Sequence, residues 1–165
     1  SLGDGSRIEK SDVRIQAYGD IDEANSSIGV SAAHSSAAIK NILLKIQNDL
    51  FDIGADLCFP EKQKRRLTIK PDRINLLEQE IDRMNESLNK LESFILPGGN
   101  KASSFLHLSR SLVRRAERSI VELKKKEDVN SDILKYVNRL SDFLFVAARF
   151  ENRKDGDILW VPNKK

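Results

Sequence analysis

The sequence predicts an all-α protein, an up-and-down bundle of about five helices that forms a single domain over residues 1–165. Three observations predict this fold. Apolar residues recur at helical spacing along most of the chain, eight Gly and four Pro leave long stretches unbroken, and no segment shows the sustained alternation of a half-buried strand. Long helices joined by short loops are typical of helical bundles. A chain of this length buries roughly 70% of its unfolded surface, so it can fold without disulfides.

Stripes of apolar residues predict the first two helices. The first covers about residues 11–34, with Ser11 as its N-cap and Asp12 in the first turn, where an acceptor and a negative charge are favourable. Gly19 predicts close packing of this helix, because an interior glycine otherwise costs roughly 1 kcal/mol. The second helix covers about residues 37–57. The apolar faces are Ile21, Ala24, Ile28 and Ala32 in the first helix, and Ile42, Ile46, Ile53 and Leu57, with a second ridge of Leu43 and Leu50, in the second.

Three more helices are predicted in the second half of the chain. The third covers about residues 71–89 and starts at Pro71, a favourable first-turn residue. The fourth follows Asn100 and runs to about Lys126, the fifth covers about residues 131–153, and residues 158–161 form a short extended piece. The expected core-facing residues are Ile74, Leu77, Ile81 and Met84 in the third helix, Leu108, Leu112, Ala116 and Ile120 in the fourth, and Ile133, Val137, Leu140, Leu144 and Ala147 in the fifth.

Composition restricts the class of protein. Hydrophobic residues make up 39%, charged residues 32% and the mean hydropathy is −0.45, which indicates a soluble globular domain rather than a disordered or membrane-spanning chain. The first residues have no signal-peptide core. Cys58 is the single cysteine, which excludes an internal disulfide and fits a cytoplasmic protein. The net charge of +3 argues against a protein devoted to nucleic acid.

The metal chemistry that is common in helical bundles is not expected. A carboxylate-bridged metal pair needs the pattern Glu-x-x-His twice. The two histidines are His34 and His107, and Ser31 and Ser104 stand three residues before them. The sequence therefore excludes a di-iron site, and we expect no metal site built from its side chains.

The strongest candidate site lies on the fourth predicted helix, where Arg110, Arg114 and Arg118 recur at helical spacing. At about 100° per residue they share one face, with His107 and Glu117 on or beside it. Such arginines repel one another unless an anion lies across them, and guanidinium groups match phosphate oxygens. The pattern favours a polyphosphate-binding face, and a solvated or salt-bridged face is the alternative.

Polar residues on two other helices are further candidates. On the fifth helix, Asn138, Asp142 and Arg149 share one side, and Asn138 could bind a ligand or a neighbouring helix. On the first helix, Asp22 and Asn25 lie on a stripe of small residues that would let another helix or subunit approach. Asp22 could pair with an arginine of the fourth helix, within the chain or across an interface, or it could be a surface carboxylate.

The remaining motifs are less specific. Gly98 and Gly99 could present backbone N–H groups to an anion, or they could form the turn that starts the fourth helix. PEKQKRR at residues 60–66 reads as a solvated basic loop rather than a nucleic-acid patch. The chain contains no G-x-x-x-x-G-K-[ST] and no G-x-S-x-G, and Cys58 reads as a small buried side chain rather than a nucleophile.

Several segments together resemble the PduO-type ATP:cob(I)alamin (corrinoid) adenosyltransferases. The segments are SLGDGSRIEKSD, AYGDIDEANSSIG, IQNDLFDIGADLC, FILPGG, LHLSRSLVRRAER, YVNRLSDFLFVAAR and DILWVP. They occur in the order of the family and span nearly the whole chain. RRAER together with NRLSD, preceded by FILPGG at its spacing, carries most of the specificity.

The resemblance implies a ferritin-like bundle, assembled as a homotrimer with active sites between neighbouring subunits. It implies two substrates, ATP bound with Mg²⁺ and cob(I)alamin, whose Co(I) attacks the 5′ carbon of ATP to give adenosylcobalamin and triphosphate. Handover of the product to an adenosylcobalamin-dependent enzyme would follow, with no membrane or nucleic-acid partner.

The resemblance also implies the roles of individual residues. Arg110 corresponds to the arginine that pairs across the interface with an aspartate, here Asp22. Phe94 corresponds to the aromatic residue that crowds the lower face of the corrin and removes the lower axial ligand. The ATP site would comprise Ser1, Lys10, Arg114, Arg115, Glu117, Arg118 and Asn138.

One departure and two alternatives accompany this interpretation. The family has a Thr-Gly-Asp-x-Gly-x-Thr-type nucleotide loop, and the sequence begins just after the position of that loop, at Ser1. A non-catalytic carrier or sensor of adenosylcobalamin on the same fold would bind the corrinoid without turning over ATP. A nucleic-acid-binding module is the other alternative, which the modest net charge and the 6% of aromatic residues disfavour.

Overall fold

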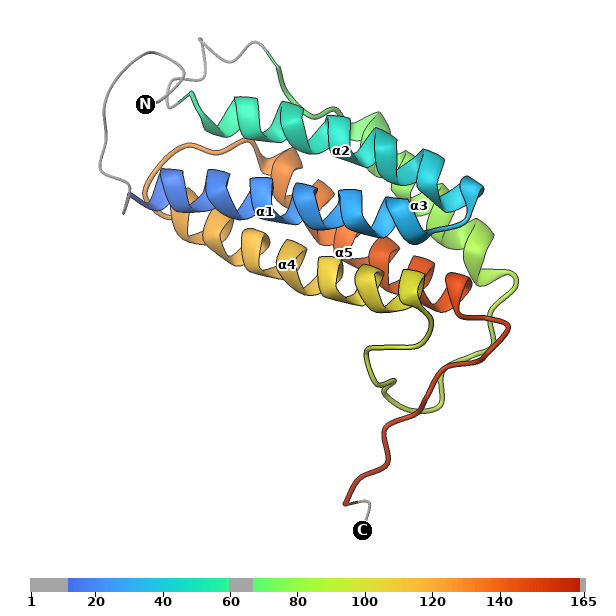
Figure 1. Ribbon diagram of the computed structural model, residues 1–165. Coiled ribbons are helices and arrows are strands. Elements are labelled where there is room, and N and C mark those ends of the chain that lie inside the picture. Colours follow the sequence, from blue (N-terminus) through green and yellow to red (C-terminus); the bar gives the residue numbers. More distant parts are fainter. Residues whose placement is uncertain (1–11, 60–66, 164–165) are drawn as a thin grey trace.

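Helices account for nearly all of the regular structure and run alternately up and down along one axis (Figure 1). The computed structural model describes residues 12–59 and 67–163. In these ranges it contains α1 (Val13–His34), α2 (Ala37–Leu57), α3 (Pro71–Asn85), α4 (Lys101–Lys124) and α5 (Ser131–Glu151). The predicted all-α bundle is therefore confirmed. The last three helices end two to four residues earlier than the sequence predicts.

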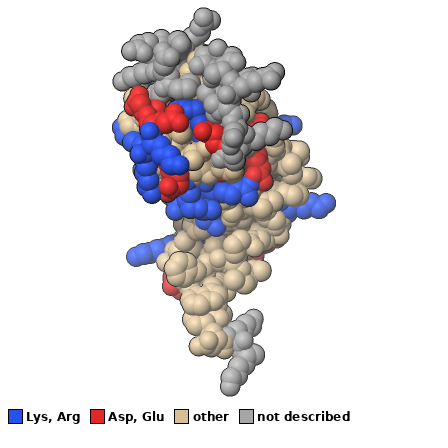
Figure 2. Space-filling view, turned by 90° about the vertical axis from the view of Figure 1, so that its left-hand side faces the viewer, with Lys and Arg blue, Asp and Glu red and all other residues tan. Residues whose placement is uncertain are grey.

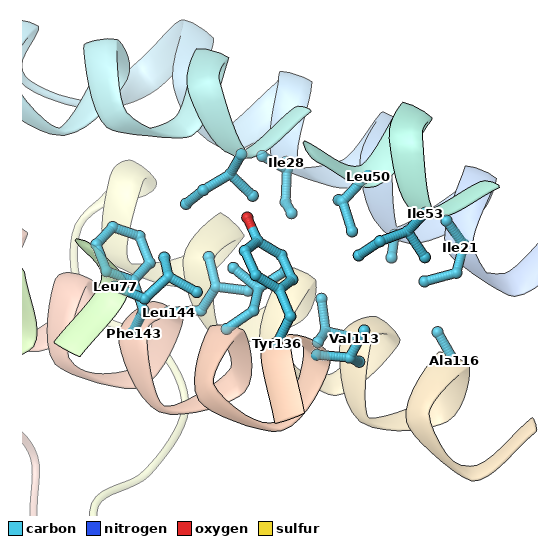
Figure 3. Packing of buried hydrophobic residues seen from close by; sticks show 14 of the residues in the cluster. Ile21, Ile28, Leu50, Ile53, Leu77, Val113, Ala116, Tyr136, Phe143 and Leu144 are labelled. Carbon is cyan, nitrogen blue, oxygen red and sulfur yellow. The ribbon is translucent and has the colours of Figure 1, made fainter. Parts of the chain in front are cut away.

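The helices pack in the order α2, α1, α4, α5, α3, so α1, α4 and α5 each have a neighbour on both sides. Apolar side chains from all five helices meet between them (Figure 3). Ile28 on α1, Leu50 on α2 and Val113 on α4 are almost fully buried, as are Tyr136 and Phe143 on α5. This core sets the outward direction of the remaining faces, which carry the candidate site.

A buried polar network joins the two ends of this packing order. Asp49 on α2 accepts hydrogen bonds from Arg73 on α3, at 2.8 and 2.9 Å, and from the hydroxyl of Tyr136 on α5, at 2.7 Å. Tyr136 is fully buried, and burial together with the Asp49 carboxylate raises the pKa of its hydroxyl well above the ordinary value. The network closes the bundle, because it links α2 to α3 and α5.

The packing of α1 against α4 depends on small polar side chains. The hydroxyls of Ser31 on α1 and Ser109 on α4 lie 2.9 Å apart, and both residues are fully buried. Gly19 does not serve this contact, because nothing lies within 4 Å of the place a Cβ would take; the prediction of close packing at Gly19 is wrong. The helix begins one residue later than predicted as well, with Asp12 as the N-cap accepting from the backbone N–H of Arg14 at 2.8 Å.

The core face of α4 differs from the predicted one. Ala116 and Ile120 are buried and Leu112 packs against the core, as expected, but Leu108 is 53% exposed. Leu106, Val113 and Leu123 complete the buried face instead. The buried face of α4 is wider than the single row of residues that the sequence predicts, because α4 packs against both α1 and α5.

Two extended segments meet beyond the bundle end. Ile95 and Leu159 form an isolated antiparallel bridge, supported by hydrogen bonds from Leu96 N to Ile158 O at 2.8 Å and from Trp160 N to Phe94 O at 2.7 Å. The predicted extended piece at residues 158–161 is thereby confirmed. Among the described residues, none of the helices combines the length and apolar character that crossing a bilayer requires.

Candidate functional site

The outward face of α4 carries the predicted arginines. Arg114 and Arg118 are exposed and Arg110 is half-buried, while Arg115 lies beside them toward α1. We call these four residues the arginine face. Figure 2 shows Lys and Arg side chains across the middle of the visible face, with a smaller number of Asp and Glu among them. The arginine face brings four positive charges together on α4, in a protein whose net charge is only +3.

Glu117 links the arginine face to α5. Its carboxylate accepts from Arg114 Nη1 at 2.5 Å on one oxygen and from Asn138 Nδ2 at 2.9 Å on the other. The sequence predicts that Asn138 binds either a ligand or a neighbouring helix. In the structure, its amide nitrogen donates to the Glu117 carboxylate at the surface between α4 and α5, so it contacts the neighbouring helix. Asn138 remains exposed, so its amide oxygen is open to a ligand.

Two of the arginines have no carboxylate partner within the described residues. Arg118 donates to the backbone carbonyl of Arg114 at 3.2 Å, and the Nε of Arg110 is buried with no hydrogen bond. A buried donor without an acceptor costs roughly 1–3 kcal/mol, so an external acceptor would be favourable here. The arginine face can accommodate an anion of more than one negative charge.

Arg115 has a different environment. It pairs with Asp20 and Glu23, both on α1, so the acidic partner found within the chain is not Asp22. Asp20 is 5% exposed and also accepts hydrogen bonds from Ser119 and from Gln16. Sequence reasoning missed Asp20 and Glu23, although their place three residues apart on one helix face could have indicated a paired site.

Asp22 is exposed and lies beside a groove between α1 and α2. The groove has a volume of about 190 Å³, and its walls include Tyr18 and Phe51, which are 40% and 69% exposed. Asn25, which is 5% exposed, lines it with a buried Oδ1 that has no hydrogen-bond donor in the described structure. Cys58 also lines the groove, and burial raises the pKa of its thiol.

Phe94 projects from the loop before α4 with 79% of its surface exposed. Its ring makes an edge-to-face contact with Trp160, whose ring centroid is 6.1 Å away. Leu96, Ile158 and Val161 are also about half exposed or more, and the lowest part of the molecule in Figure 2 is largely uncharged. Exposed apolar side chains gathered in this way indicate a binding surface.

The two glycines before α4 form a turn. Gly99 has a φ of +101°, and a Cβ at this position would lie 2.6 Å from the side chain of Asn152. Asn100 caps α4 by accepting from Ser103 N at 3.0 Å, and the hydroxyl of Ser103 donates to Gly98 O at 2.7 Å. The turn therefore starts the helix, which is the simpler of the two interpretations of these glycines.

Two sequence-based placements, those of His107 and Arg149, are wrong, whereas Asp142 is exposed on the same helix as the exposed Asn138, as predicted. His107 is 3% exposed and packs edge-to-face on Phe145, so it lies beneath the arginine face rather than on it. Burial, with the charge of Arg110, lowers the pKa of His107 below its ordinary value. Arg149 is buried and bonded to Asp157 at 2.7 Å, and Asp142 pairs with Arg139, so the expected polar side of α5 is divided among separate contacts.

Some predicted residues lie outside the described part of the chain. These are Ser1 and Lys10 of the expected ATP site, together with the basic segment 60–66. Within residues 12–59 and 67–163, no group of three or more His, Cys, Asp or Glu side chains is placed to hold a metal ion.

Comparisons with known proteins match most of the chain. A model of the family described as cobalamin adenosyltransferase matches residues 1–151. A corrinoid adenosyltransferase of Mycobacterium tuberculosis is 45% identical over 98% of this chain and 86% of its own length. A corrinoid adenosyltransferase of Bacillus subtilis is 42% identical over 92% of this chain and 81% of its own length.

The fold matches a solved structure equally well. A variant of the PduO-type ATP:corrinoid adenosyltransferase of Lactobacillus reuteri, complexed with cobalamin and ATP, superimposes with a TM-score of 0.92. The two chains are 36% identical, and the match covers 96% of this chain and 92% of the other.

Proposed function

This chain belongs to the cobalamin adenosyltransferase family, and from that premise we propose that the arginine face and the apolar surface around Phe94 are the two halves of its active site. The protein is an ATP:corrinoid adenosyltransferase. It transfers the 5′-deoxyadenosyl group of ATP to the Co(I) of a reduced corrinoid. Co(I) attacks the 5′ carbon, the bond from that carbon to oxygen breaks, and its electron pair leaves with triphosphate.

The arginine face supplies what the leaving group needs. Negative charge develops on the triphosphate as the bond breaks, and guanidinium groups placed in advance stabilise that charge without reorganisation. Arg114 and Arg118 are exposed, and Arg118 has no carboxylate partner among the described residues. The observation that carries the proposal is this uncompensated charge beside the Glu117–Asn138 pair, whose free amide oxygen can receive the ribose or the base. We place Arg115, Ser1 and Lys10 at the same nucleotide, with Mg²⁺ arriving as part of the ATP complex.

The apolar surface supplies the other half. The exposed ring of Phe94, packed against Trp160, offers a flat apolar support for a corrin. A phenylalanine has no atom that can coordinate cobalt, so its presence beneath the corrin keeps the lower axial position free of a protein ligand. Removing that ligand makes Co(II) easier to reduce, which is the electronic contribution expected of the protein in cofactor chemistry.

We propose a homotrimer with active sites between subunits. The groove beside Asp22 on one subunit and Arg110 on the next support it, because the groove offers a carboxylate and an unpartnered carbonyl oxygen while Arg110 has an unpartnered Nε. Pairing these groups would satisfy both at once. We also propose a cytoplasmic location, supported by ATP as the substrate, and handover of the product to an adenosylcobalamin-dependent enzyme.

An anaerobic assay tests the active-site proposal. The protein is mixed with Mg-ATP and chemically reduced cobalamin, and the loss of the Co(I) absorbance band and the gain of a light-sensitive product are followed. Arg114→Ala is expected to lower kcat/KM by a factor of about 10² or more, since removing one donor to a developing charge has effects of this order.

Arg83→Ala is the matched control. Arg83 on α3 is 47% exposed, as Arg114 is, and both arginines pair with a glutamate three residues away on their own helix. Arg83→Ala should leave kcat/KM unchanged. Equal losses in the two variants would contradict the assignment, and corrinoid binding by the native protein without any conversion would favour the carrier interpretation.

A further inference from the structure

Among the described residues, Arg115 is the one member of the arginine face that pairs with acids of a neighbouring helix. Its buried Nε lies 3.5 Å from Asp20 Oδ1, an ion-pair contact without a hydrogen bond, and Nη2 contacts the carboxylate of Glu23, both on α1. The two acids differ in burial, since the side chain of Asp20 is 6% exposed and that of Glu23 is 50% exposed. Arg115 is thus held by one fixed partner and one surface partner.

Asp20 is fixed by contacts of its own. One oxygen accepts from Gln16 Nε2 at 3.1 Å, and the other accepts from the hydroxyl of Ser119, one helical turn from Arg115 on α4. A carboxylate held by two donors and almost fully buried cannot follow a moving guanidinium. Within the described residues, Glu23 pairs with Arg115 alone, and its exposed carboxylate can rotate into solvent.

The two contacts lie on different atoms of the guanidinium. Asp20 faces the Nε side, next to the helix, and Glu23 faces the terminal Nη2. An anion on the arginine face would approach the terminal nitrogens, because these are the exposed end of a side chain that is 42% exposed. Such an anion competes with Glu23 and leaves the contact with Asp20 in place.

We propose that Asp20 is a positioning residue for the triphosphate site: it holds Arg115 at the edge of the arginine face, while Glu23 is the surface partner that an incoming phosphate displaces. The inference rests on the proposed function, since it takes the arginine face as the site of the triphosphate. It adds two residues of α1 to the site and assigns them opposite effects on anion binding.

Two variants with the same charge change test the inference. Asp20→Asn and Glu23→Gln each remove one negative charge near the arginines, so long-range electrostatics alone predicts tighter anion binding in both. If Asp20 positions Arg115 through their partly buried ion pair, Asp20→Asn weakens binding by about 10-fold despite the favourable charge change. Glu23→Gln removes only a competitor and tightens binding by about 2- to 5-fold, the range for an exposed ion pair.

The measurement is calorimetric titration of the full chain with inorganic tripolyphosphate, followed by the KM for ATP. Opposite shifts in the two variants support the inference. Tighter binding in both, an unchanged affinity in Asp20→Asn, or no tripolyphosphate binding by the native protein would overturn it. If tripolyphosphate binds with the expected pattern but no adenosylation occurs, the proposed function fails and the inference stands.

Two further variants separate positioning from folding. Ser119→Ala removes one of the two hydrogen bonds that fix Asp20 but keeps its charge beside Arg115, so tripolyphosphate affinity should fall by less than it does in Asp20→Asn. In an Arg115→Lys background, neither the loss in Asp20→Asn nor the gain in Glu23→Gln should persist. If Asp20→Asn does not fold, the surface variant Glu23→Gln still decides, because a gain that survives in the Arg115→Lys background would overturn the inference.

Discussion

The hydroxyl of Tyr136 gives the sharpest test of how the bundle is closed. Tyr136→Phe keeps the ring, which is fully buried, and removes only the hydrogen bond of 2.7 Å to Asp49. A hydrogen bond to a charged group contributes about 1.5–3 kcal/mol, and Asp49 keeps its two bonds from Arg73. We therefore expect a loss of about 2 kcal/mol, or about 4–8 °C in Tm for a domain of this size.

Urea unfolding at pH 7 measures this loss, with Tyr18→Phe as the control. Tyr18 is 40% exposed and its hydroxyl makes no hydrogen bond within the described residues, so its removal should change stability by less than about 0.5 kcal/mol. Adenosyltransferase activity below the unfolding temperature should be unchanged in Tyr136→Phe. Equal stability of the two variants would refute the argument that the buried network closes the bundle.

The same hydroxyl gives a dependence on pH. The pKa of Tyr136 is raised in the folded state above its ordinary value of 10.0, so folding disfavours the phenolate. Its contribution to stability is complete below about pH 10 and is lost as the pH rises further. Native protein should therefore lose stability above pH 10 more steeply than Tyr136→Phe, and parallel curves would contradict the assigned cause of the shift.

Other substitutions test separate parts of the structure. Because the pKa of His107 is lowered by burial, native protein should lose stability as the pH falls below about 6.5, and His107→Phe should flatten that slope in urea titrations at pH 5 to 7. Gly99→Ala should lower stability by about 1–3 kcal/mol in the same assay, because φ is +101° there and the new Cβ meets a side chain. Leu106→Ala should cost about 2–5 kcal/mol in thermal unfolding and Leu108→Ala less than about 0.5, because only the first is buried. Phe94→Ala should leave Tm within 2 °C but lower the rate of corrinoid adenosylation at least about 10-fold, and an unchanged rate would remove it from the site.

The positions of the helices could be predicted closely because each depends on local sequence. The predicted second helix has the observed bounds of Ala37–Leu57, and the third begins at Pro71 as expected. The exact first and last residues of the helices were less predictable, because they depend on which unpaired backbone N–H and C=O groups of the terminal turns find a partner. Asp12 rather than Ser11 caps α1, for example, because its side chain reaches the backbone N–H of Arg14.

Helical spacing predicted that Arg110, Arg114 and Arg118 share one face, and the structure confirms it. Spacing could not predict how wide the buried face of α4 is, which depends on how many neighbours the helix has. His107 and Leu108 were misplaced for this reason: one is covered by Phe145 and the other faces solvent.

The sequence by itself determined the number of helices, their order and the residues that carry the positive charge, since periodicity and charge are properties of each segment alone. Only the tertiary structure decided the partners. Arg115 lies with Asp20 and Glu23 rather than with Asp22, and Asp49 lies with Arg73 and Tyr136. These contacts join helices whose relative rotation is set by packing of the whole core, and a rotation of one residue position moves a side chain by about 100° around the helix axis.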